Sequence, residues 1–200
     1  MRIPGAVTRA IDHAGMLLEA DAELPSIASL VVGEAIRGSW WAHPRANEIY
    51  DICVALDDRE DLITIKLLKG KVTRVARPLW PALFTIARAR APWQRRRLKP
   101  DAARLLRRVT REGELRLDGI SWRGKRKPGA VARELEARLL VLGEEMHTEQ
   151  GRHTKSLLDW ELFGRRHALS PLTSVEAAEH LVEEAAQRLD PRALKALPWR

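Results

Sequence analysis

A β-branched stretch that turns back on itself constrains the fold more than any other feature of the sequence. Residues 62–76 contain two strand-like runs joined by a Lys-Gly-Lys turn, which is typical of a hairpin. Apolar residues at helical spacing precede this hairpin over 6–20 and 26–37, and a third helical pattern opens at Pro44. Three helices followed by a hairpin is the element order of a winged-helix unit.

The same order of elements returns after residue 100. A helix is predicted over 101–111 and a short strand over 115–117, followed by a basic loop that contains glycines. Another helix is predicted over 130–140, and a second hairpin signal joins the runs 140–148 and 153–158. The second half of the chain therefore also predicts a helix, a recognition helix and a wing.

We therefore predict a mainly α-helical α+β fold with short β-hairpins, built from tandem winged helix-turn-helix units. Residues 1–77 are the first winged-helix-like unit, and 78–99 are a basic linker helix and loop. Residues 100–162 are the second winged-helix unit, and 163–200 are a helical tail.

Composition predicts a soluble globular protein. Apolar residues make up 45% of the 200 residues, which is enough for a core. No apolar run approaches the ~20 residues that a membrane helix needs, and the first residues lack the unbroken apolar core of a signal peptide. The single cysteine, Cys53, cannot form an internal disulfide. We expect a cytoplasmic protein with no membrane partner, associated with the nucleoid if the cell is bacterial.

The charge is concentrated in the middle of the chain. The formal net charge is +8, but residues 66–127 hold 20 Lys and Arg against four Asp and Glu, so this segment carries +16 and the remainder −8. A general preference for arginine would not exclude carboxylates from the same stretch. Such a segment attracts polyanions, of which nucleic acid is the commonest. The alternative is that the basic middle packs against the acidic ends, within the fold or in a homodimer.

Candidate DNA-binding residues follow from this charge and from the predicted elements. Trp93 lies in the densest basic stretch, where its ring can stack on an unpaired base or be stacked by arginines. Arg133 lies opposite the apolar face of the helix over 130–140, whereas Glu134 and Glu136 on that helix oppose contact with phosphates. The candidates lie in the first hairpin turn, the linker, the second basic loop, the helix after it and the second hairpin: Lys69, Lys71, Arg88, Arg90, Trp93, Arg95, Arg96, Arg97, Arg123, Lys125, Arg126, Lys127, Arg133, Arg152 and Lys155.

No pattern of residues predicts an active site, a metal site or a cofactor. His147, Glu149 and His153 lie close together, but their spacing matches no known zinc motif. The sequence contains no phosphate-binding Gly-x-x-x-x-Gly-Lys, no dinucleotide-binding Gly-x-Gly-x-x-Gly and no Gly-x-Ser-x-Gly nucleophile elbow. Cys53 lies on the apolar stripe of its helix, which favours a core residue over a nucleophile.

Four segments together resemble a known group of proteins. They are residues 65–73 followed by Leu79-Trp80-Pro81-Ala82-Leu83, then 105–113, and then 133–142 ahead of a hairpin that ends in Leu158-Asp159-Trp160. Over residues 38–162 the chain resembles the uncharacterised winged-helix proteins grouped with the AlkZ (YcaQ) type DNA glycosylases. This resemblance implies tandem winged helices that bind DNA, with a link to base-excision or crosslink repair.

The chain departs from those glycosylases at the residues that carry their chemistry. The glycosylases excise bases with a Gln-x-Gln motif, but the only glutamines here are Gln94, Gln150 and Gln187. The resemblance therefore supports DNA binding without base excision. We predict a non-enzymatic winged-helix protein that binds duplex or branched DNA. The alternatives are a glycosylase-like repair enzyme, and a protein interaction module that dimerises through its basic middle segment.

Overall fold

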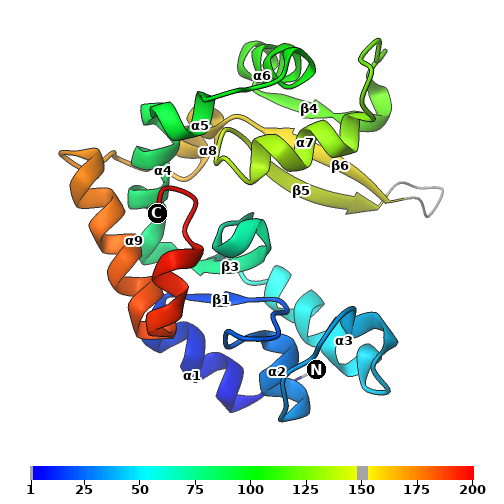
Figure 1. The fold of residues 1–200 in the computed structure, drawn as a ribbon, viewed down its shortest axis with the longest axis vertical. Helices are drawn as coiled ribbons and strands as arrows, with labels where there is room; N and C mark the ends of the chain where they lie inside the picture. The colour runs from blue at the N-terminus through cyan, green and yellow to red at the C-terminus, as the bar shows by residue number, and fades with distance from the viewer. Residues whose placement is uncertain (1, 148–152) are drawn as a thin grey trace. The chain divides into compact units, whose positions relative to one another are not determined.

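The computed structural model describes residues 2–147 and 153–200 and shows a mixed α+β protein. Helices account for 54% of the chain and strands for 14%, which confirms the predicted mainly helical α+β class. The chain divides into two compact units (Figure 1). Unit 1 comprises residues 1–80 and 179–200, and unit 2 comprises residues 81–178. None of the described helices is long and apolar enough to cross a membrane.

Unit 1 is built from short helices around a three-stranded antiparallel sheet. Its elements up to residue 76 are α1 (Gly5–Ala14), β1 (Met16–Leu18), α2 (Ile27–Val32), the 3-10 helix η1 (Trp40–Ala42), α3 (Ala46–Asp57), β2 (Leu62–Lys66), the 3-10 turn η2 (Leu68–Gly70) and β3 (Val72–Ala76). The strand order is β1-β3-β2, and Ile65 lies opposite Thr73 in the predicted hairpin. The core lies between the helices and one face of the sheet, with Ile11, Ile27 and Ile52 fully buried.

The predicted helix over 6–20 is wrong in its second half. Helix α1 ends at Ala14 because Gly15 takes a φ of 74°, a left-handed conformation that glycine adopts at little cost. The next three residues form β1, in which Met16 pairs with Val75. All three side chains of β1 are buried, so they show no strand-like alternation of polar and apolar residues.

The end of the chain belongs to unit 1. Helix α9 (Val175–Leu189) crosses the boundary between the units, and the 3-10 helix η5 (Pro191–Ala196) lies against η2. Leu189 packs against the core of unit 1. The indole Nε1 of Trp199 donates to Glu183 at 2.9 Å, and Arg200 pairs with the same carboxylate. These contacts fix the last residues to unit 1.

Unit 2 repeats the strand order of unit 1. Its elements are α4 (Trp80–Ala89), α5 (Pro92–Arg95), α6 (Pro100–Glu112), β4 (Glu114–Arg116), the 3-10 turn η4 (Leu117–Gly119), α7 (Pro128–Glu136), β5 (Leu142–His147), β6 (His153–Leu158) and α8 (Trp160–Arg166). The antiparallel sheet has the order β4-β6-β5. Leu105 and Val109 of α6 share a core with Val131 and Leu135 of α7.

One buried amide joins three segments of unit 2. The side chain of Gln94 in α5 is inaccessible to solvent. Its Oε1 accepts from the backbone N–H of Ala91 at 2.7 Å, and its Nε2 donates to the carbonyls of Ala87 at 3.4 Å and Arg138 at 3.2 Å. Arg138 in turn donates to the carbonyl of Gln94 at 3.1 Å. Gln94 therefore ties the end of α4 to the segment after α7.

Candidate nucleic-acid interface

The positive charge of the chain lies in unit 2. Unit 2 holds 21 Lys and Arg against 12 Asp and Glu, a formal net charge of +9, whereas unit 1 holds 14 against 15 and carries −1. The basic stretch over 66–127 is thus divided by the fold, because its first fifteen residues belong to unit 1. Unit 2 therefore carries the positive charge that a polyanion-binding surface requires.

Helix α6 presents a row of arginines. Its buried face consists of Ala102, Leu105, Leu106 and Val109. The spacing i, i+3, i+4, i+7 places four arginines together on the opposite face. They are Arg104, Arg107, Arg108 and Arg111.

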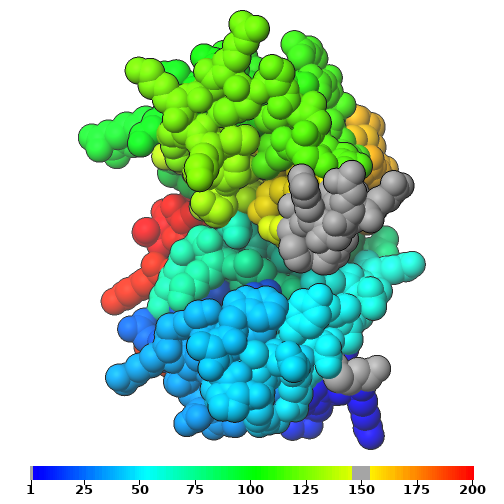
Figure 2. Space-filling view, turned by 90° about the vertical axis from the view of Figure 1, so that its right-hand side faces the viewer, coloured from blue at the N-terminus to red at the C-terminus, as the bar shows by residue number. Residues whose placement is uncertain are grey.

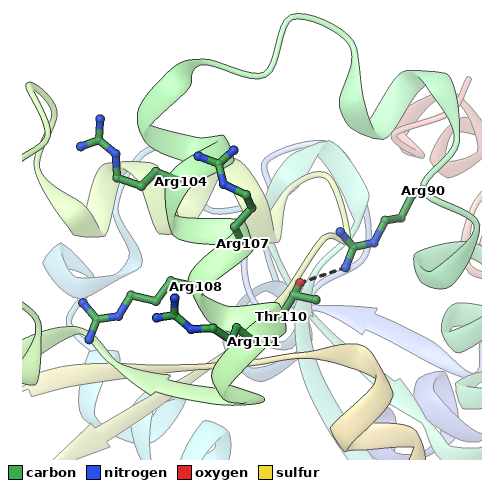
Figure 3. A pocket seen from close by; sticks show the side chains of 6 residues that line it. All are labelled: Arg90, Arg104, Arg107, Arg108, Thr110 and Arg111. Atoms are coloured by element: carbon green, nitrogen blue, oxygen red, sulfur yellow. Dashed lines mark hydrogen bonds between the residues drawn. The ribbon is translucent and has the colours of Figure 1, made fainter.

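These arginines line an open groove of about 580 Å³, which we call the arginine groove: Arg90, Arg104, Arg107, Arg108, Thr110 and Arg111. Figure 3 shows the arginine side chains of α6 spread along the helix, with Arg90 approaching from a neighbouring segment. The Arg90 guanidinium donates to Thr110 Oγ1 at 3.0 Å. Five guanidinium groups thus surround one hollow.

Carboxylates partly neutralise the arginine groove, and one of them, Asp159, lies 3.8 Å from Arg90. Glu112 accepts from both Arg108 Nε and Arg111 Nη2 at 2.9 Å, and these hydrogen bonds lower its pKa. Asp101 lies 3.9 Å from Arg104. Within the described part of the chain, Arg107 has no carboxylate within 4 Å. Guanidinium forks bind phosphate oxygens in a bidentate manner, so the groove has the chemistry of a phosphate-binding surface.

Sequence reasoning missed the α6 arginines, although it named Arg90. The signal was present, because the four arginines repeat at helical spacing opposite the apolar residues of α6. A run of adjacent cations such as residues 95–97 is easier to see than a periodic one. Periodicity, and not local density, brings charges to one face of a helix.

The loop between η4 and α7 carries a second set of cations. Arg123, Lys125 and Lys127 are exposed, and no carboxylate pairs with any of them in residues 2–147 and 153–200. In the space-filling view the light-green loop segment projects long side chains from unit 2 (Figure 2). The indole of Trp122 donates to the Arg126 carbonyl at 2.6 Å, and Asp101 accepts from the Arg126 N–H at 3.2 Å. The loop is therefore held near the start of α6.

The glutamates of α7 are already paired inside unit 2. Glu134 accepts from Arg126, and the buried Glu136 accepts from Lys155 Nζ at 2.9 and 3.1 Å. The repulsion of phosphates expected from these carboxylates is thus reduced. Arg126 and Lys155, which the sequence predicts as DNA contacts, are thus already paired with glutamates. Arg133 remains exposed on α7, without a carboxylate partner among the described side chains.

Some of the candidates in the linker are exposed without a carboxylate partner, and others already contact residues of unit 2. Arg95, Arg96 and Arg97 are exposed, and the described residues place no carboxylate beside them. Arg88 donates to Glu161 at 2.5 Å and lies over the Phe84 ring. Trp93 is half-buried. Arg152, the candidate at the tip of the second hairpin, lies outside the described residues.

The candidates in unit 1 face acids of the same unit. Lys71 Nζ lies 2.7 Å from Asp21, and Lys69 Nζ lies 3.2 Å from Asp21 and 2.7 Å from Glu23. Asp21 is buried and also accepts from the N–H groups of Glu23 and Leu24. Burial alone would raise the pKa of Asp21, but its hydrogen bonds with Lys71, the two N–H groups and Lys69 hold that pKa far below its usual range. These two lysines therefore tie the turn between β2 and β3 to the segment around Asp21 and Glu23.

We expect Asp21→Asn to destabilise the protein most at neutral pH and less as the pH falls below about 4. Losing the charged hydrogen bonds costs about 2–3 kcal/mol of unfolding free energy at pH 7. Because the folded pKa is depressed, the stabilisation is fully present above the unfolded pKa of about 4 and is lost progressively as the pH falls from there through the folded pKa. Urea unfolding from pH 7 to pH 3 measures the difference between wild type and variant. A difference that stays constant over this range would contradict the assignment, and the exposed Glu23→Gln is the control.

The metal-ligating residues and the cysteine that the structure describes do not gather at one place. In residues 2–147 and 153–200 no group of three His, Cys, Asp or Glu is placed to hold a metal ion. Burial raises the pKa of the Cys53 thiol to about 12, so the thiolate that a nucleophile requires does not form near neutral pH. The candidate ligand Glu149 and the side chains of His147 and His153 lie outside the described parts of the structure.

Comparison of the chain with models of known protein families, with curated proteins and with solved structures found no match.

Proposed function

We propose that this chain is a DNA-binding protein that contacts the phosphate backbone through unit 2. The observation that carries the proposal is the arginine groove, an open hollow on one unit that is lined by five arginines. Such a cluster is unfavourable in isolation because like charges repel each other. A polyanion relieves this repulsion and releases its own counterions on binding.

The proposal includes a winged-helix assignment for both units. In each unit a helix leads into the first strand, a later helix precedes a hairpin, and the first strand pairs with the last. This is the connectivity of a winged helix-turn-helix, in which the helix before the wing approaches the major groove. In unit 2, η4 and the loop after it stand where the second helix would be. Helix α7 is then the recognition helix and β5–β6 the wing.

The proposed contacts are mainly with phosphates and not with base edges. Arg133 is the one cation of α7, and it is exposed, whereas the arginine groove and the loop at Arg123, Lys125 and Lys127 supply further positive charge. Phosphate contacts position a protein without reading the sequence. The proposal therefore predicts strong salt dependence and weak sequence preference, and base excision is not part of it because the chain has no Gln-x-Gln motif.

Fluorescence anisotropy with the full chain tests the proposal. Labelled duplex, single-stranded and four-way branched DNA of equal length are titrated at several salt concentrations. We expect binding at low salt, with a loss of about a hundredfold or more in affinity for duplex between 50 and 200 mM salt. No binding at low salt, or an affinity independent of salt, would overturn the proposal. Alkali treatment of alkylated duplex after incubation shows whether abasic sites form, which we do not expect.

A further inference from the structure

The exposed face of α3 has a chemistry opposite to that of the arginine groove. The described residues include four large apolar side chains that are exposed, and three of them lie in this region. Trp41 is 61% exposed, and Tyr50 and Val54 on α3 are 40% and 41% exposed. Trp41 stacks on the buried Trp40 at 4.0 Å, and its ring centre lies 5.6 Å from that of Tyr50. These side chains are thus held in place at the surface.

Two unpaired carboxylates flank this apolar centre. Tyr50, Asp51, Val54, Ala55 and Asp58 line a shallow hollow of about 320 Å³. Asp51 and Asp58 are exposed, and no described cation lies within 4 Å of either. We call this surface the α3 patch: Trp41, Tyr50, Asp51, Val54 and Asp58.

The carboxylates next to the α3 patch are already neutralised. Glu48 accepts two hydrogen bonds from Arg45, at 2.8 and 2.7 Å. Asp57 pairs with Arg74 at 3.0 Å. The patch therefore carries a local charge of its own, from Asp51 and Asp58, and it repels a polyanion. Although α3 holds the place in unit 1 that α7 holds in unit 2, its surface is unsuited to DNA.

The arginine row of α6 matches the α3 patch in chemistry and in spacing. Asp51 and the C-cap residue Asp58 of α3 are seven residues apart, as are Arg104 and Arg111 on α6, which is about 10 Å along each axis. Arginine stems are apolar and cover surfaces such as Val54, while the guanidinium planes pair with carboxylates and stack on Tyr and Trp rings. A helix that carries arginines can therefore contact both the apolar side chains of the patch and its two carboxylates.

We propose that the α3 patch of one copy docks on the arginine groove of a second copy of this chain, and that nucleic acid competes for the same groove. Charge complementarity carries this choice of partner, since the unpaired carboxylates lie on a unit of charge −1 and the arginines on a unit of charge +9. The docking between copies does not rest on the proposed function, because it is measured without nucleic acid, whereas the competition does rest on it.

Sedimentation velocity of the full chain at 50 mM salt tests the docking. We expect the average mass to rise above the 22.7 kDa of one chain as the concentration increases into the hundred-micromolar range. Asp51→Arg with Asp58→Arg should weaken this association at least tenfold, and 500 mM salt should abolish it. The control, Asp12→Arg with Glu184→Arg, makes the same charge change elsewhere in unit 1 and should leave the association within about twofold of wild type.

A charge swap separates docking from a general effect of charge. Arg104→Glu with Arg111→Glu should also remain monomeric, because both surfaces of that variant are then acidic. Mixing it with the Asp51→Arg, Asp58→Arg variant restores both complementary contacts, so the mixture should associate although neither variant does so alone. A mixture that stays monomeric overturns the proposal, as does a wild-type chain that is monomeric throughout. Self-association of wild type without any DNA binding would contradict the proposed function and the competition, and would leave the docking between copies standing.

Adding duplex DNA to associated wild type tests the competition. A 20-base-pair duplex should dissociate the copies from each other. Each arginine groove should then hold DNA in place of the α3 patch of another copy. Copies that stay associated while the duplex binds would show that the two ligands use different surfaces, and would overturn the shared groove. Capture of an arginine-rich peptide by the α3 patch without self-association would identify another occupant and would also overturn the choice of a second copy.

Discussion

Replacing Arg104, Arg107, Arg108 and Arg111 together by alanine should lower the affinity for duplex DNA by about a hundredfold or more at 0.1 M salt. Each phosphate contact contributes about 0.9 to the slope of log K against log salt, so the slope should fall by about 3 to 4. Anisotropy titrations of wild type and variant at five salt concentrations measure both quantities. Alanine is the best helix former, so α6 should remain folded.

The matched control removes equal charge from unit 1. Arg2, Arg9, Arg37 and Arg188 are exposed and have no carboxylate partner in the described ranges, and their replacement by alanine gives a chain of the same net charge. This variant should bind duplex DNA within a few-fold of wild type, because these four arginines belong to unit 1 and do not line the arginine groove. Equal loss of affinity in both variants would show that net charge, and not the arginine groove, controls binding.

Gln94→Leu should destabilise unit 2 by about 3–5 kcal/mol. The leucine leaves the N–H of Ala91 and the carbonyls of Ala87 and Arg138 without their side-chain partner, and each unsatisfied buried group costs about 1–3 kcal/mol. Solvent cannot replace these bonds, since the Gln94 side chain is inaccessible. Thermal and urea unfolding followed by circular dichroism measure the loss.

A second glutamine serves as the control for Gln94. Gln187 on α9 is exposed, and its replacement by leucine removes the same amide from a solvated position. The change should alter the unfolding free energy by less than about 0.5 kcal/mol. A Gln94→Leu variant as stable as Gln187→Leu would show that the amide of Gln94 does not join α5 to its neighbours.

The sequence predicts those elements whose signals are local. Helix α6 begins and ends within a residue of the prediction because Pro100 and Gly113 mark its two ends and its apolar residues are periodic. The local pattern predicts a helix where β1 lies, because the partner strand β3 is more than fifty residues away and all three side chains of β1 are buried. A short strand is stabilised by its neighbours, which a local pattern does not contain.

The residues of the candidate site could also be predicted from the sequence only where their signal is local. The four arginines of α6 could be predicted from their spacing alone, once the helix was assigned. The occupation of Lys71 by Asp21, and of Lys155 by Glu136, could not be predicted, because the fold brings together residues 50 and 19 positions apart. Counting cations along a chain measures the charge that is present, whereas only the fold shows which cations are already paired.

Protection of arginines from chemical modification tests the central claim most directly. The full chain is treated with phenylglyoxal with and without saturating duplex DNA, and the modified arginines are identified by mass spectrometry. The account predicts protection of Arg104, Arg107, Arg108 and Arg111 by DNA, with Arg2, Arg9 and Arg37 modified equally in both samples. Equal modification of the α6 arginines in the presence of bound DNA would contradict the claim that the arginine groove is the DNA contact.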